Sequence, residues 1–142
     1  MADYYELVIY HVPTAQPRPR RGKHGAMYVP SNHPVHVFRS LIAAEFRRCK
    51  YPRLDGPIEL RVSAYFPRPK RLLIKRAPPG RLPFIVNKCD WDNLGKAVSD
   101  ALTHYAWRDD GQIVRALVER YYCAMDEPPH VRISWRDLTA DT

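Results

Sequence analysis

The residues best suited to chemistry in this chain are acidic and gather around one lysine. The segment DWDNLGKAVSDAL begins at Asp90, and the segment WRDDGQIV follows at Trp107. Carboxylates that converge without partners raise one another's pKa and weaken the fold, so such a group needs a counter-charge. A divalent cation supplies it, and carboxylate oxygens suit Mg²⁺ and Mn²⁺. The pattern therefore predicts a Mg²⁺ site, with Mn²⁺ as the alternative ion.

The spacing within the first segment places side chains on a common face. Asp92, Lys96 and Asp100 recur every four residues, so they share one side of a helix. Asp90 lies two residues before Asp92 in a segment expected to be extended, where side chains two apart point the same way. Two interpretations of Asp100 remain open, because it either binds the metal or forms an ion pair with Lys96. Asp109 is likewise either part of the site or a turn residue.

Basic residues are concentrated in two stretches that contain no acid. The chain has 142 residues, 23 Lys and Arg, and a formal net charge of +8. Residues 11–44 contain five of these bases and residues 67–88 contain seven. Two basic segments beside an acidic metal centre are typical of a protein that binds a polyanion.

Length and composition indicate one domain, 1–142, in a reducing compartment. The three cysteines form no Cys-x-x-Cys unit and cannot all pair. No stretch approaches the roughly 18 apolar residues of a membrane span, and the first residues lack the pattern of a secretory leader. We expect a soluble cytoplasmic protein of a bacterium or phage-infected cell, with no membrane partner.

Apolar periodicity predicts two helices and about four strands. One helix is expected over 34–50, and a second from an N-cap at Asp92 or Asn93 to about His104. Strands are expected at 4–12, 57–66, 112–122 and 131–135. This order favours an α+β fold, a small two-layer sandwich in which a mixed sheet of about four strands is covered by two helices. Trp107 and Trp135 are expected in the core or at an interface.

Long basic loops are expected at about 13–33 and 67–88. Both are rich in Pro and Arg, which excludes helix and central strand. The second is too long for an ordinary connection, so it is either a functional flap that orders on its ligand or a disordered insertion.

The run KCDWDNLGKAVSDAL followed by WRDDGQIV resembles the RusA-type Holliday junction resolvases. The family pattern is K-P-D-x-D-N-L-x-K-x-x-x-D-A-L and then W-x-D-D-x-Q-V. The resemblance implies that Asp90, Asp92 and Asp110 hold the catalytic metal and that Lys96 is the essential lysine. The sequence departs from the pattern at Cys89, where the family often has proline.

The resemblance also implies an activity and partners. It predicts a homodimeric, magnesium-dependent, structure-specific endonuclease that resolves four-way junctions and related branched DNA by paired symmetric nicks, in DNA recombination and repair. A non-catalytic junction-binding protein and a metal-dependent enzyme acting on free nucleotides are the alternatives. The residues expected to bind DNA lie in the two basic loops: Gln16, Arg18, Arg20, Arg21, Lys23, Arg68, Lys70, Arg71 and Lys88.

Overall fold

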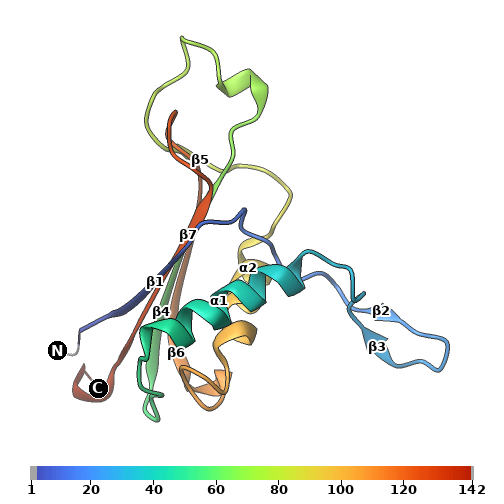
Figure 1. Ribbon diagram of the computed structural model, residues 1–142, viewed down its shortest axis with the longest axis vertical. Coiled ribbons are helices and arrows are strands. Elements are labelled where there is room, and N and C mark those ends of the chain that lie inside the picture. The colour runs from blue at the N-terminus through green and yellow to red at the C-terminus, as the bar shows by residue number, and fades with distance from the viewer. Residues whose placement is uncertain (1–2, 142) are drawn as a thin grey trace.

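A five-stranded mixed sheet carries both helices on one face (Figure 1). This computed structural model describes residues 3–141, so the two ends of the predicted domain, 1–2 and 142, lie outside the described part. The strands run in the order β1-β7-β4-β6-β5. Their bounds are β1 (Tyr5–Ile9), β4 (Ile58–Phe66), β5 (Leu82–Pro83), β6 (Ile113–Tyr122) and β7 (His130–Asp137). The helices are α1 (Val35–Cys49) and α2 (Trp91–Leu102). None of the described helices is long and apolar enough to cross a membrane.

The strand pairing confirms the predicted small α+β class. β7 pairs antiparallel with both β1 and β4, whereas β4 and β6 pair in parallel. A parallel pair needs a crossover connection, and α2 forms part of the one between β4 and β6. The sheet has one strand more than the four expected from the sequence. The extra strand, β5, has only two residues, and one of them is Pro83. A strand this short has no alternating pattern, and proline is unusual in strands, so the sequence did not predict it.

The apolar core lies between the sheet and the two helices. Leu60, Val62 and Ala64 alternate along β4 and are almost fully buried, as a strand with one core face requires. Trp107 and Trp135 have no exposed surface, which confirms their predicted place in the core.

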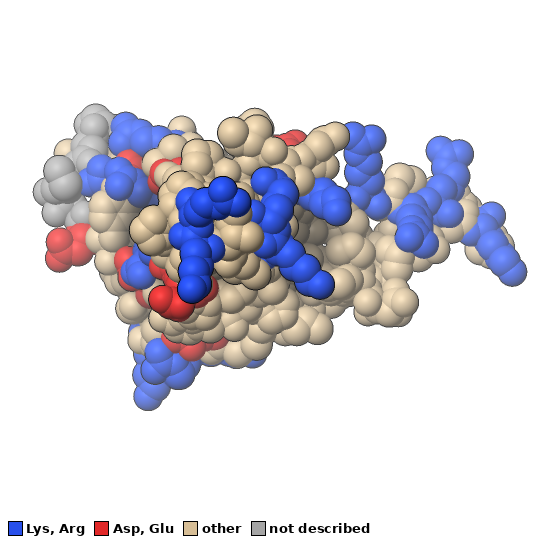
Figure 2. Space-filling view, turned by 90° about the horizontal axis from the view of Figure 1, so that it is seen from above, with Lys and Arg blue, Asp and Glu red and all other residues tan. Residues whose placement is uncertain are grey.

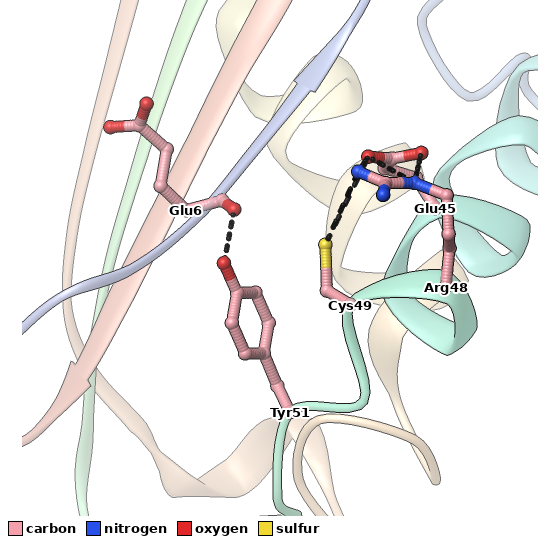
Figure 3. Close-up of polar contacts among 5 residues, drawn as sticks. All are labelled: Glu6, Glu45, Arg48, Cys49 and Tyr51. Carbon is pink, nitrogen blue, oxygen red and sulfur yellow. Dashed lines mark hydrogen bonds and ion pairs between the residues drawn. The ribbon is translucent and has the colours of Figure 1, made fainter.

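The end of α1 is fastened to the sheet by polar contacts (Figure 3). The hydroxyl of Tyr51, just beyond the helix, donates to the backbone carbonyl of Glu6 in β1 at 3.0 Å. Within the last turns, Arg48 Nη2 lies 2.5 Å from Glu45 Oε1, and this pairing lowers the pKa of the Glu45 carboxyl. Lys50 takes a left-handed conformation at φ 56° and ends the helix.

The second helix begins earlier than the sequence predicted. Its N-cap is Asp90, not Asp92 or Asn93, and the side chain of Asp90 makes no capping hydrogen bond. Asp92 lies instead in the first turn, where a carboxylate interacts favourably with the helix dipole. The helix ends at Leu102 because Thr103 turns to an extended conformation. Thr103 Oγ1 donates back to the Ser99 carbonyl at 2.8 Å.

The two basic loops have defined structures. Residues 13–33 include a small hairpin, β2 (Arg20–Arg21) with β3 (Met27–Tyr28), which extends away from the sheet (Figure 1). In the second loop, the guanidinium of Arg68 is buried. It donates to four backbone carbonyls: Cys123 at 2.8 Å, Leu72 at 2.9 Å, Pro78 at 2.7 Å and Gly80 at 2.6 Å. These bonds hold the loop in shape, contrary to a disordered insertion.

Glu59 lies on the face of the sheet away from the helices, yet it is only 2% exposed. Its carboxylate accepts a hydrogen bond from the Tyr4 hydroxyl. It also accepts from three guanidinium groups: Arg61 at 2.8 Å, Arg115 at 2.8 Å and Arg136 at 3.4 Å. The bond from Tyr4, followed by those from Arg115 and Arg136, lowers the pKa of the Glu59 carboxyl to about 2. One buried carboxylate thus joins the outer faces of β4, β6 and β7.

We expect Glu59→Gln to lower the free energy of unfolding by about 3 kcal/mol at pH 7, because it removes the buried charge that pairs with the buried guanidinium of Arg136 and with the exposed ones of Arg61 and Arg115. The folded-state pKa lies below the ordinary 4.5, so this stabilisation is complete above that pH and is lost as pH falls toward about 2. Urea unfolding of both proteins between pH 7 and pH 2 measures it. A difference between them that stays constant below pH 4.5 would contradict the assignment.

Candidate active site

A pocket of about 290 Å³ lies between α2 and β6. Asp92 and Lys96 reach it from α2, and Asp110 reaches it from the turn before β6. The remaining lining residues are mostly apolar: Leu60, Trp91, Gly95, Ser99, Ile113, Ala116 and Val118. The structure therefore brings three of the four predicted catalytic residues to one cavity, with apolar walls that strengthen electrostatic interactions inside it.

The fourth predicted residue, Asp90, lies beside the pocket along the chain but is not part of its lining. Its side chain is exposed and does not cap α2. Within residues 3–141 no three His, Cys, Asp or Glu side chains are close enough together to hold a metal ion. Mg²⁺, however, is usually bound through one or two carboxylates and completes its shell with water and phosphate oxygens. Asp92 and Asp110 fit that mode of binding.

Gly95 explains how α2 lies so close to β6. A Cβ at this position would be 3.3 Å from Cγ2 of Val118, tighter than an ordinary contact. Glycine inside a helix costs about 1 kcal/mol relative to alanine. The cost is offset here by the close approach that places the α2 side chains against the turn bearing Asp110.

Asp100 contacts Lys96 and does not line the pocket. The Lys96 Nζ is 3.9 Å from Asp100 Oδ1, and Arg39 Nη1 on α1 is 3.7 Å from Asp100 Oδ2. The same Arg39 nitrogen donates to Gln16 Oε1 at 3.2 Å. This chain of contacts links the first basic loop, α1 and α2. It supports the interpretation in which Asp100 pairs with Lys96.

The turn bearing Asp110 is held by Gln112, which the sequence analysis did not identify. The Gln112 amide nitrogen donates to the carbonyls of Leu54 and Gly56, both at 3.0 Å. Its amide oxygen accepts from the backbone nitrogens of Arg108 at 2.7 Å and Asp109 at 3.0 Å. The Asp109 side chain in turn accepts from Gly111 N, so Asp109 has a turn-forming role. The only sequence feature that could have indicated this role is the position of Gln112 within the WRDDGQIV segment.

The backbone just before Asp90 is strained. Cys89 has φ 53°, in the left-handed region that non-glycine residues rarely adopt. Proline is locked near −65° and cannot take this conformation, so the proline of the family pattern would not fit the backbone as it stands here. Arg120 Nη1 donates to the carbonyls of Val86, Lys88 and Cys89 at 3.3–3.4 Å and holds the segment in place. Burial raises the pKa of the Cys89 thiol to about 11, which keeps it neutral.

Trp91 is an exposed aromatic residue at the mouth of the pocket. It lies between Asp90 and Asp92, lines the pocket, and is 62% exposed. We expected the tryptophans to lie in the core or at an interface, and Trp91 is not in the core. An exposed indole provides a face on which a nucleobase stacks.

Most predicted DNA-binding residues are exposed on the two basic loops (Figure 2). They are Arg18, Arg20, Arg21, Lys23, Lys70, Arg71 and Lys88. Figure 2 shows Lys and Arg side chains gathered on the projecting parts of this face, with few acidic ones among them. Gln16 and Arg68 differ from the expected exposed positions, because each is only 8% exposed. Their side chains bond within the protein, as described above.

The protein is a small α+β domain with a pocket lined by two carboxylates and a lysine. These residue types can bind a metal ion and a phosphate group. Residues 11–135 match the family model described as endodeoxyribonuclease RusA. The chain therefore belongs to the RusA endodeoxyribonuclease family, which confirms the resemblance. It is also similar to the uncharacterized protein YqaN of Bacillus subtilis (strain 168), with 30% identity over 147 residues that cover 97% of this chain and 99% of that protein.

Gln112→Ala should lower the free energy of unfolding by about 1–3 kcal/mol, because it leaves partly buried backbone groups without their bonds. Asp109→Ala, which removes one capping acceptor, should cost about 1 kcal/mol. Urea denaturation at pH 7 measures both, with exposed Asn87→Ala as the matched control. A Gln112→Ala protein as stable as the control would show that Gln112 does not hold this turn.

Proposed function

We propose that this protein is a magnesium-dependent, structure-specific endonuclease that resolves Holliday junctions and related branched DNA in recombination and repair. The observation that carries the proposal is the pocket in which Asp92, Lys96 and Asp110 meet. Family membership supports the nuclease class. The exposed basic loops support a nucleic-acid substrate, because phosphate contacts from Lys and Arg dominate affinity for DNA.

Each residue of the proposed site has a distinct task. Asp92 and Asp110 would hold Mg²⁺, with Asp90 beside them, and Mn²⁺ would bind the same oxygen ligands. When bound, the ion supplies charge stabilisation for the attacking water and the leaving oxygen. Lys96 is a flexible point charge that neutralises the scissile phosphate or orients the nucleophile. Asp100 contacts the Lys96 ammonium and Arg39 contacts Asp100, so these ion pairs would limit the movement of Lys96.

The DNA would be held on both sides of this pocket. The β2–β3 hairpin provides Arg20 and Arg21, and the second loop provides Arg71 and Lys88, all exposed. Trp91 would stack on a base near the cut, because its exposed indole offers an aromatic face. Resolution requires two symmetric nicks, so we propose a homodimer with one pocket in each subunit.

Asp92→Asn and Asp110→Asn should each lower the nicking of a synthetic four-way junction on the order of 100-fold or more, because each removes charge from the proposed metal site. Junction affinity should change little, since the loops provide the phosphate contacts. Cleavage gels with each arm labelled, and binding gels without divalent metal, measure the two effects. Asp126→Asn, in the exposed turn before β7, is the matched control.

Paired, symmetric cuts by the wild-type protein are the expected pattern. A wild-type protein that binds the junction with steep salt dependence but nicks it in no divalent metal would instead be a binding protein. Preferential competition by mononucleotides over junction DNA would identify an enzyme that acts on free nucleotides.

Millimolar Mg²⁺ should raise the melting temperature, because a ligand that binds only the folded state stabilises it by about 2.7 kcal/mol at 100 times its Kd. Asp92→Asn should blunt the rise, and Asp126→Asn should retain it. Differential scanning calorimetry with Mg²⁺, with EDTA, and with NaCl at matched ionic strength measures the effect. Identical melting curves in Mg²⁺ and EDTA would remove the support for a metal at this pocket.

A further inference from the structure

β6 is an edge strand over most of its length. β4 pairs with it along one side from Ile113 to Tyr122. On the other side β5 pairs only at Tyr121 and Tyr122. Among the described strands, none pairs with residues 113–119 on that open side. Unprotected edges of this length invite pairing with another chain.

The backbone groups that face the open side can be identified. Phe84 N donates to the carbonyl of Arg120 at 3.3 Å, so that carbonyl points away from β4. Backbone groups alternate in direction along a strand, as the side chains do. Ala116 and Val118 therefore direct their N–H and C=O groups to the open side, where a further strand would bond to them.

The side chains along this edge are exposed and self-complementary. Ala116 and Leu117 are exposed, with Leu117 at 48%. Arg115 and Glu119 lie two residues before and after Leu117, so all three share one face of the sheet. An apolar position between opposite charges pairs favourably with its own antiparallel copy, since opposite charges across strands are stabilising.

We propose that β6 pairs antiparallel with β6 of a second copy of this chain, about a two-fold axis at Leu117. Leu117 then lies opposite Leu117 of the second copy, and Arg115 lies opposite its Glu119. Ala116 and Val118 exchange backbone hydrogen bonds with Val118 and Ala116 of the second copy, as their direction requires. A two-fold axis at Ala116 would place Arg115 opposite Leu117 of the second copy. An axis at Val118 would place Glu119 opposite Leu117 of the second copy. Either register loses the pairs between Arg115 and Glu119. The interface is isologous and closes as a dimer.

This pairing has a consequence for the candidate active site, which rests on the proposed function. The side chains of Ala116 and Val118 line the pocket. A two-fold axis perpendicular to a sheet keeps each face on the same side. The two pockets therefore open on one face of a continuous sheet, on either side of the axis, where one junction reaches both.

A disulfide test reports the register directly. Opposed residues in a non-hydrogen-bonded antiparallel pair have Cα atoms about 4.5 Å apart. This separation lies within the roughly 4.4–6.8 Å range that a disulfide spans. Leu117→Cys should form a covalent dimer under mild oxidation, seen on non-reducing gels. Val114→Cys, also exposed at 63%, is the matched control, because the two copies of residue 114 lie about 20 Å apart in this register. The wild-type chain, with its three cysteines, sets the background.

Sedimentation velocity without DNA or metal tests the interface itself. The wild-type chain, 16.6 kDa, should sediment as a dimer at micromolar concentration. Leu117→Lys should raise the dissociation constant at least tenfold, whereas Val37→Lys, at an exposed position on α1, should not. Circular dichroism checks that each variant folds. A monomeric wild type, an open series of larger species, a dimer unchanged by Leu117→Lys, or cross-linking at Val114→Cys equal to that at Leu117→Cys would each overturn the pairing. None of these outcomes depends on whether the protein cleaves DNA.

Discussion

The close contact between α2 and β6 is the constraint on which the candidate site depends. Asp92 and Lys96 belong to a helix, and Asp110 belongs to a turn that follows it in sequence, so only packing brings them to one pocket. Gly95 permits that packing because any larger residue would press on Val118. The amphipathic character of α2 also positions the site. Leu94, Ala97, Val98, Ala101 and Leu102 are buried, and their burial holds the polar face of α2 toward the pocket.

Side chains that donate to backbone carbonyls fix the shape of the loops. Arg68, Arg120 and Gln112 each donate to carbonyls of irregular segments, which have no strand or helix to satisfy them. Each therefore gives a loop a defined shape, and two of them act beside site residues: Gln112 at the turn that bears Asp110, and Arg120 at the segment just before Asp90. Arginine suits this task because its fixed fork of donors reaches several carbonyls at once. Basic residues in this chain thus divide into those that shape the loops and those that remain exposed on them.

Local patterns predicted the elements, and tertiary contacts decided the rest. The periodicity of α1 and the alternation of β4 lie in adjacent residues, so the sequence contained them. Arg68 was expected on the surface because it lies in a run of basic residues, but its guanidinium reaches carbonyls up to 55 positions away. Glu59 alternates as an exposed residue should, and its burial follows from arginines on β6 and β7 that neighbour β4 only in the folded sheet. The pocket residues Asp92, Lys96 and Asp110 were identified through a motif, while Gln112 and Trp91 required the geometry.

A pocket with few protein ligands suits the proposed activity. A site that encloses Mg²⁺ fully in protein oxygens leaves no position for water or phosphate, whereas two carboxylates leave most of the shell open. Substrate phosphate then contributes ligands, so metal and DNA would stabilise each other's binding at this pocket. Lys96 adds a positive charge that remains when no ion is bound, and its pair with Asp100 limits the movement of the ammonium group. The positive loops would attract DNA of any shape, so the proposed selectivity for branched DNA would have to come from the spacing and orientation of the pockets. In the proposed dimer the subunit interface would set that spacing, which would make the open edge of β6 as important to the proposed substrate choice as the acidic residues themselves.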